Sequence, residues 1–209
     1  MILTQQEVRE KLGIDIDTDY VTSREFIMEH VVYRVINDKR RNQKIKMIYR
    51  KYLDLAVTYC VVINKNVRYQ MTDEIMENKN ITMRELEEAA KRNTRKQGYY
   101  YKTMNEMLGM EDTFCMMPNG YVVTNKTGLF GAAAMQMAEL MDEIADKFGG
   151  RCIVIPSSIH ELILTSYRPD KLDLLNDHIK KVNESSFTEE VLSDHAYIYE
   201  SGKGMQIVA

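Results

Sequence analysis

Runs of hydrophobic residues along the chain alternate with short polar turns and with longer segments of helical spacing. Residues 52–63, YLDLAVTYCVVI, are rich in β-branched and aromatic side chains and are followed by a polar segment, so they predict the first strand of a hairpin. Residues 113–125 and the last residues of the chain show the same arrangement around turn residues. The turns of these predicted hairpins lie at 64–66, 118–120 and 201–204, and a further pair of strands is expected at 152–155 and 159–165.

Apolar residues spaced three and four apart, preceded by capping residues, predict the helices. Thr4 with Glu7, and Thr82 with Glu85, each have the spacing of a capping box, in which the threonine caps the first turn and the glutamate reaches back. A helix is also expected from Thr22 or Ser23 to about Asn37. The other helices are expected at 82–96, 131–148 and 169–186, and the last of these carries an apolar stripe of Leu172, Leu175, Ile179 and Val182.

The order of these elements predicts an α+β fold. Hairpins form antiparallel ladders, and helices between them can all cover one face of the resulting sheet. We therefore expect an antiparallel sheet built from successive hairpins, separated by helices on one face, with a helical N-terminal segment. Residues 1–50 are expected to form that segment and residues 51–209 the α+β domain, and no linker rich in proline, glycine or serine separates them.

Composition and charge narrow the class of protein. The 209 residues are 44% hydrophobic and 28% charged, as in an ordinary globular protein, and the net charge of −3 gives no whole-molecule attraction to nucleic acid or anionic lipid. No apolar run approaches the roughly 20 residues of a spanning helix, and the first residues lack the segments of a signal peptide. Cys60, Cys115 and Cys152 lie far apart, which predicts buried thiols in a reducing compartment. We expect a cytoplasmic protein without membrane contact.

Serine and histidine residues cluster near 150–167 and 193–195 and raise the question of catalysis. Alternation along a strand would place His160 on the face of Leu162 and would turn Glu161 to the opposite face, so these neighbours cannot act on one atom. Ser157 and Ser158 lack the G-x-S-x-G turn of a nucleophile, and a hydrolase would need His160 or His195 to approach one of them in the fold. The candidate polar cluster is Ser157, Ser158, His160, Asp194 and His195.

No other pattern of reactive residues points to a cofactor or a metal. The spacings H-x-x-x-H and C-x-x-C are absent from the sequence, and no glycine-rich phosphate loop occurs. We therefore assign no catalytic residue, no metal and no cofactor.

A basic stretch, DKRRNQKIKMIYRKY, is the candidate binding site. Seven of the thirteen residues 39–51 are basic, and tyrosines are interleaved with them, as in surfaces that contact nucleic acid. The alternative is a solvated helix with Ile45, Ile48 and Tyr52 facing inward. The candidate binding residues are Lys39, Arg40, Arg41, Lys44, Lys46, Tyr49, Arg50 and Lys51.

Several segments together resemble an uncharacterised family. They are YLDLAVTYCVV, ELEEAAKRNT, VVTNKTGLFGAAAM, IVIPSSIHELIL and VNESSFTEEVLSDHAYIY, within residues 35–200, and PSSIHE with LSDHAY is the most specific part. The chain is similar to a family of gut-Firmicute proteins known as domain of unknown function 5688. The resemblance implies a cytoplasmic protein of bacterial, phage or mobile-element origin, and it implies no activity.

Three functions are consistent with these patterns. The absence of a convergent set of acid, base, nucleophile or ligands favours a non-enzymatic module that binds another protein; on a mobile element, a specific version is an antagonist of a host defence nuclease. The first alternative is a nucleic-acid-binding protein that uses the basic stretch. The second is a hydrolase with a serine and a histidine brought together by folding.

Overall fold

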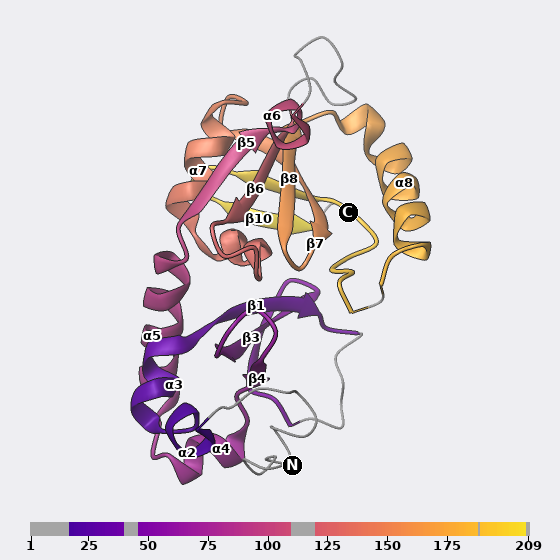
Figure 1. Cartoon of the computed structure of the whole chain (residues 1–209). Coiled ribbons are helices and arrows are strands. Elements are labelled where there is room, and N and C mark those ends of the chain that lie inside the picture. Colours follow the sequence, from indigo (N-terminus) through magenta and orange to yellow (C-terminus); the bar gives the residue numbers. More distant parts are fainter. Residues whose placement is uncertain (1–16, 40–45, 110–119, 188, 208–209) are drawn as a thin grey trace.

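The described strands form two antiparallel sheets that lie one above the other (Figure 1). The structure is a computed structural model, and it describes residues 17–39, 46–109, 120–187 and 189–207. The smaller sheet has the order β1-β3-β2, and β4 also pairs with β3; these strands are β1 (Val31–Asn37), β2 (Tyr49–Tyr52), β3 (Leu55–Val62) and β4 (Arg68–Gln70).

The larger sheet has the order β10-β9-β7-β8-β6-β5, so β5 and β10 are its edges among the described strands. Its strands are β5 (Tyr99–Thr103), β6 (Tyr121–Asn125), β7 (Arg151–Ser158), β8 (Glu161–Ser166), β9 (Tyr197–Glu200) and β10 (Gly204–Ile207). The predicted α+β class with antiparallel pairing is confirmed. The hairpins β3–β4, β7–β8 and β9–β10 are where the sequence places them, but the strands within the described ranges form two sheets where one was predicted.

In the part of the chain that the structure describes, four helices belong to the smaller sheet: α2 (Thr18–Val21), α3 (Arg24–His30), α4 (Asp73–Asn78) and α5 (Met83–Lys96). Helices α3 and α5 lie against one face of this sheet, and α5 contacts β1 (Figure 1). The predicted capping box at the start of α5 is present, because Thr82 Oγ1 accepts from the Glu85 backbone N–H and Glu85 accepts from that of Thr82. Leu86, Ala89 and Ala90 are its buried stripe.

The helix expected to reach Asn37 ends instead at His30, and this prediction is wrong for residues 31–37. The segment VVYRVIN is rich in β-branched residues, which favour a strand, and all seven of its residues pair with β3. The serine at the predicted start does cap the helix, since Ser23 Oγ accepts from the Phe26 backbone N–H. The sequence therefore indicates where α3 begins, and strand pairing decides where it ends.

Helices cover both faces of the larger sheet, whereas one covered face was predicted. Helix α7 (Ala138–Asp146) packs with Cys152 and Val154 of β7, and α8 (Leu172–Glu184) packs with Ile153 and Ile155, which point to the opposite face. Figure 1 shows the two helices on either side of the sheet. The remaining short helices are α6 (Met104–Leu108) and the 3-10 helices η1 (Gly131–Gln136) and η2 (Pro169–Lys171).

Two predicted helices differ in detail from the observed ones. The segment expected at 131–148 is divided into η1 and α7, and residues 131–135 are buried. In α8, Leu172 and Ile179 are buried, but Val182 of the predicted stripe is 50% exposed, because only one narrow side of this helix meets the sheet.

Some predictions lie outside the described residues: the capping box at Thr4, the turn at 118–120, Cys115, and the basic residues Arg40, Arg41 and Lys44. Within the described ranges, no helix has the length and apolar character needed to cross a bilayer.

The two sheets share one hydrophobic core, which places side chains from distant segments side by side. Helix η1 lies between the sheets and contacts β1, β6 and β8. At its end, Arg50 Nη2 of β2 donates to Gln136 Oε1 at 2.6 Å, and the Tyr52 hydroxyl donates to the Met135 carbonyl. The region between the sheets therefore includes polar contacts beside its hydrophobic core.

Candidate functional site

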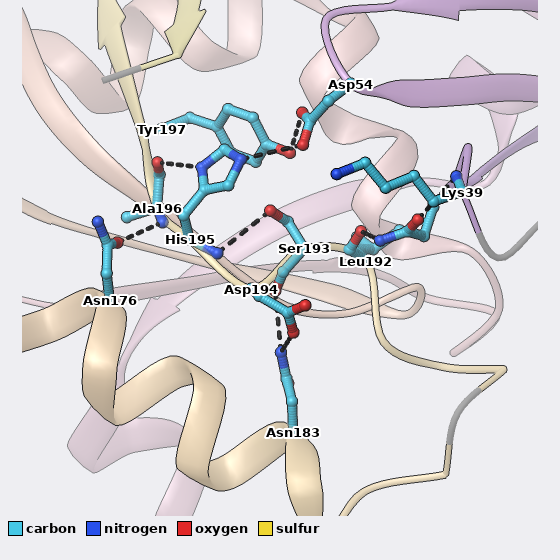
Figure 2. Close-up of polar contacts among 11 residues, drawn as sticks. Lys39, Asp54, Asn176, Asn183, Leu192, Ser193, Asp194, His195, Ala196 and Tyr197 are labelled. Atoms are coloured by element: carbon cyan, nitrogen blue, oxygen red, sulfur yellow. Dashed lines mark hydrogen bonds and ion pairs between the residues drawn. The ribbon is translucent and has the colours of Figure 1, made fainter. Parts of the chain in front are cut away.

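His195 lies at a junction between the two sheets, shown in Figure 2. Its Nε2 is 2.9 Å from Oδ2 of Asp54, in the turn between β2 and β3, and its Nδ1 is 2.9 Å from the Ala196 carbonyl oxygen. The Tyr197 hydroxyl donates to the other oxygen of Asp54 at 2.7 Å. Burial, with the neighbouring carboxylate, raises the pKa of Tyr197, so this hydroxyl stays protonated and serves as a donor. The Asp54 carboxylate, between β2 and β3, thus contacts both His195, which precedes β9, and Tyr197, which begins it.

The segment 192–196 around this histidine is fixed by amide side chains. Asn37 Nδ2 of β1 donates to the Leu192 carbonyl at 2.8 Å, and Asn176 Oδ1 of α8 accepts from the Ala196 backbone N–H. Asn183 Nδ2, also of α8, donates to both the Ser193 carbonyl and Asp194 Oδ1 at 2.9 Å (Figure 2). The predicted site residues Asp194 and His195 therefore belong to a hydrogen-bonded junction that joins β1, α8 and β9.

The other predicted polar residues lie in and next to the turn between β7 and β8. The Ser157 hydroxyl donates to Glu161 Oε1 at 3.2 Å, and Ser158 Oγ accepts from the His160 backbone N–H at 3.0 Å. His160 Nδ1 accepts from the backbone N–H of Phe130 at 3.2 Å. Hydrogen bonds among the described residues join neither serine hydroxyl to an imidazole. The arrangement that a serine hydrolase needs is not formed by these groups.

Among the described residues, no group of three His, Cys, Asp or Glu side chains is placed to hold a metal ion. The two thiols of the described residues are buried. Burial raises the pKa of Cys60 to about 11 and that of Cys152 to about 12, and both are free cysteines in the core. The predicted burial of these two thiols is confirmed.

The basic stretch contains a strand at 49–52 instead of a helix, and its side chains divide between two faces. Tyr49 and Lys51 are exposed on one face. Arg50 points to the other face, where it pairs with Glu87 of α5 at 3.5 Å and lies over the Tyr33 ring. The Lys39 backbone N–H donates to Asn37 Oδ1, and Lys46 is exposed before β2.

Strand register brings two further arginines to the face of Tyr49 and Lys51. Arg34 of β1 and Tyr49 of β2 both pair with Thr58 of β3, and residues directly opposite in a ladder point to the same side. Arg68 of β4 pairs with Val62, four residues further along β3, and so shares this side too. We call Arg34, Tyr49, Lys51 and Arg68 the basic face; Arg34 is half-buried and the other three are exposed.

Sequence reasoning missed Arg34 and Arg68 because neither lies in a basic stretch. The available signal was a charged residue inside an alternating strand segment, VVYRV for Arg34 and VRYQ for Arg68. This signal could not show that the two arginines lie on one face of the sheet, because that depends on the pairing of β1 and β4 with β3.

The two arginines converge on one aromatic ring. The guanidinium carbons of Arg34 and Arg68 lie 5.5 and 5.7 Å from the ring centroid of Phe130, and His160 stacks against the same ring. Burial lowers the pKa of Arg34, and the charge of Arg68 lowers it further. Among the described residues, neither guanidinium forms an ion pair. Two neighbouring guanidinium groups that form no ion pair with a described carboxylate, one half-buried and one exposed, are suited to bind oxyanions.

No curated protein and no solved structure matches this chain. The family described as a family of unknown function, DUF5688, matches residues 1–201, which confirms the resemblance noted in the sequence. The chain therefore belongs to the DUF5688 family of unknown function.

Proposed function

We propose that this protein is a non-enzymatic binding module that binds single-stranded nucleic acid through the basic face. The observation that carries the proposal is the placement of three cationic side chains and one exposed tyrosine on one side of the smaller sheet. Cationic side chains attract phosphates, and an exposed aromatic ring can stack on an unpaired base. A strand face offering both contacts suits a single strand better than a duplex.

The charge of the whole chain does not oppose this proposal, because binding depends on the local field. The net charge is −3, yet the carboxylate of Glu87 that neutralises Arg50 lies on the opposite face of the sheet. Tyr49 is 40% exposed. Ion pairs with phosphates and stacking on a base plane do not involve the base edges that differ between sequences. We therefore expect little sequence preference.

Fluorescence anisotropy with a labelled oligothymidylate tests the proposal. We expect binding that weakens as salt rises, with a logarithmic slope of roughly −0.7 for each phosphate contacted. A duplex of the same length should bind less tightly. No anisotropy change at low salt, or an affinity that does not respond to salt, would count against nucleic-acid binding.

A protein partner is the second candidate, and it is supported by large apolar side chains around α8. Leu174 and Val182 of α8 are 74% and 50% exposed, and Phe187, beyond the end of the helix, is 81% exposed. In a bacterial or mobile-element protein, such a partner could be a host defence nuclease. A pull-down from the native host should then recover a protein with wild-type bait and lose it with a bait carrying Leu174→Asp and Phe187→Asp. Equal recovery by both baits would exclude this surface.

A cytoplasmic location is part of the proposal. It is supported by the two free thiols, Cys60 and Cys152, which persist most readily in a reducing compartment.

A further inference from the structure

We infer that Arg34, Arg68 and His160 form a binding site for a phosphate monoester. The three side chains come from β1, from β4 and from the turn between β7 and β8, and all three lie around the ring of Phe130. The phosphate could be the 5′ end of a nucleic acid or part of a free nucleotide. The first form rests on the proposed function, whereas the site itself does not.

Hydrogen-bond donors remain available at this site. When the Gln70 amide is turned so that its oxygen faces the arginine, Arg34 Nη1 donates to that oxygen at 3.0 Å. Arg34 Nε is buried and has no partner among the described residues. Arg68 Nη1 donates to the Lys65 carbonyl at 3.2 Å, which leaves further N–H groups of that guanidinium. An oxyanion accepts several hydrogen bonds at once and would satisfy these donors.

The tautomer of His160 adds a third donor. Because Nδ1 accepts from the Phe130 backbone N–H, a neutral ring must carry its hydrogen on Nε2. Burial lowers the pKa of this histidine, and the net shift stays downward although the charge of Glu190 acts against it. The ring is therefore neutral at neutral pH. A neutral Nε2–H donates to a phosphate oxygen without the repulsion that a third cation would add.

Charge at the site favours a dianion. Arg34 and Arg68 are close enough for each charge to act on the other, and neither is ion-paired with a described carboxylate. The negative charge of Glu189 acts to raise the pKa of Arg34, and that of Glu190 acts to raise the pKa of His160. Both glutamates are exposed. A phosphate monoester carries close to two negative charges at neutral pH and matches the two guanidinium groups.

The backbone around the site is held in place. Phe130 has a left-handed backbone conformation with φ of 57°, and Thr124 Oγ1 donates to the His160 carbonyl at 3.0 Å. Gly131 approaches that carbonyl so closely that a Cβ would lie 2.0 Å from its oxygen. The ring and the imidazole are therefore positioned before any ligand arrives, which reduces the entropy lost on binding.

The test uses the full chain with three probes: inorganic phosphate, oligothymidylate with a 5′ phosphate, and the same oligomer with a 5′ hydroxyl. Binding of inorganic phosphate is followed by NMR through the amide signal of Phe130, which donates to His160. The variant is Arg68→Gln, because Arg68 is exposed and its loss should leave the fold intact, as circular dichroism would show. The matched control is Lys65→Gln, which removes a neighbouring exposed charge.

We expect phosphate to shift the Phe130 signal, with an affinity about tenfold lower in Arg68→Gln and unchanged in Lys65→Gln. If the source is a nucleic-acid end, the phosphorylated oligomer binds more tightly than the hydroxyl oligomer, and Arg68→Gln removes that difference. If neither oligomer binds while phosphate does, the site takes a free nucleotide and the proposed function fails. Equal binding of the two oligomers without any phosphate response would overturn the site and leave the proposed function standing. A response to phosphate that Arg68→Gln leaves unchanged would also overturn the site, and no binding of any probe would overturn both.

Discussion

The Nε2 atom of His195 lies 2.9 Å from Oδ2 of Asp54, although the two residues are 141 positions apart in the chain. This contact joins the turn between β2 and β3 to the start of β9, and Tyr197 reinforces it through the second carboxylate oxygen. It belongs to the seam between the sheets, where η1, Phe130 and His160 also lie. The relative position of the sheets, and with it the approach of Arg34 to Phe130, depends on contacts of this kind.

Replacing Asp54 with alanine should destabilise the fold. The carboxylate accepts hydrogen bonds from His195 and Tyr197, and its side chain is 32% exposed, so we expect a loss of about 2 kcal/mol in the free energy of unfolding. Urea denaturation measures it. The control is Asp177→Ala, which removes an exposed carboxylate 3.8 Å from Lys180 and should change stability by less than about 0.5 kcal/mol. Similar effects of the two variants would show that the junction does not stabilise the fold.

Gly131→Ala should be among the most damaging small substitutions. A Cβ at this position would lie 2.0 Å from the His160 carbonyl oxygen and 2.7 Å from Thr124 Oγ1, so backbone must move, at a cost of at least about 3 kcal/mol. Gly128→Ala is the comparison, because its φ is 71° but no atom lies within 4 Å of the added Cβ. Backbone strain alone should cost about 1–2 kcal/mol there. Thermal unfolding of both variants would show whether Gly131 is the more sensitive position.

Stability should fall as the pH drops below about 6.5, in part because of His160. Burial lowers the pKa of this histidine in the folded protein, so the unfolded chain binds a proton that the folded chain resists. This contribution is fully present above the unfolded pKa and is lost as the pH decreases. In phosphate-free buffer, His160→Asn should flatten the dependence of unfolding free energy on pH, because an amide oxygen can accept from Phe130 without titrating. His178→Asn, at an exposed position, should leave it unchanged. A wild-type slope retained in His160→Asn would contradict this role.

The described thiols should be unreactive in the native protein. Burial raises the pKa of Cys60 to about 11 and that of Cys152 to about 12, and both side chains are almost fully covered. In a Cys115→Ser background, a thiol reagent at pH 8 should modify neither residue until denaturant is added. Rapid modification of one thiol in native buffer would show that the core opens at that residue.

Local patterns predicted most of the elements of the larger sheet. Alternation at 152–165 and the glycines near 201–204 identify β7, β8, β9 and β10, because hairpin partners are neighbours in sequence and their turns have recognisable chemistry. The capping box at Thr82 likewise identifies α5. Such patterns could not predict the division into two sheets, because the local sequence does not distinguish a strand that continues one sheet from a strand that begins another.

Two errors have physical causes that lie outside the local sequence. The segment EFIMEHVVYRVIN has apolar residues that suit a helix as well as a strand, and pairing of Val31–Asn37 with β3 determines its second half. The segment GAAAMQ has high helix propensity but forms a 3-10 helix, buried where β1, β6 and β8 meet.

The candidate site was only partly predictable. Tyr49 and Lys51 belong to a basic stretch that is visible in the sequence. Arg34 and Arg68 join them on one face only through the register of β3 with its neighbours. The Asp54 partner of His195 is equally a product of the tertiary fold. Serines 157 and 158 attracted attention by composition, and their hydrogen bonds to Glu161 and to the His160 backbone are those of an ordinary turn.

The most direct test of nucleic-acid binding compares two charge reversals in the salt dependence of oligothymidylate affinity. Lys51→Glu changes the basic face, and Lys91→Glu changes an exposed lysine of α5, which lies on the other side of the smaller sheet. We predict that Lys51→Glu weakens binding and reduces the magnitude of the salt slope by about 0.7, whereas Lys91→Glu keeps the wild-type slope. Equal slopes and equal affinities for the two variants would contradict the assignment of the basic face as the binding surface.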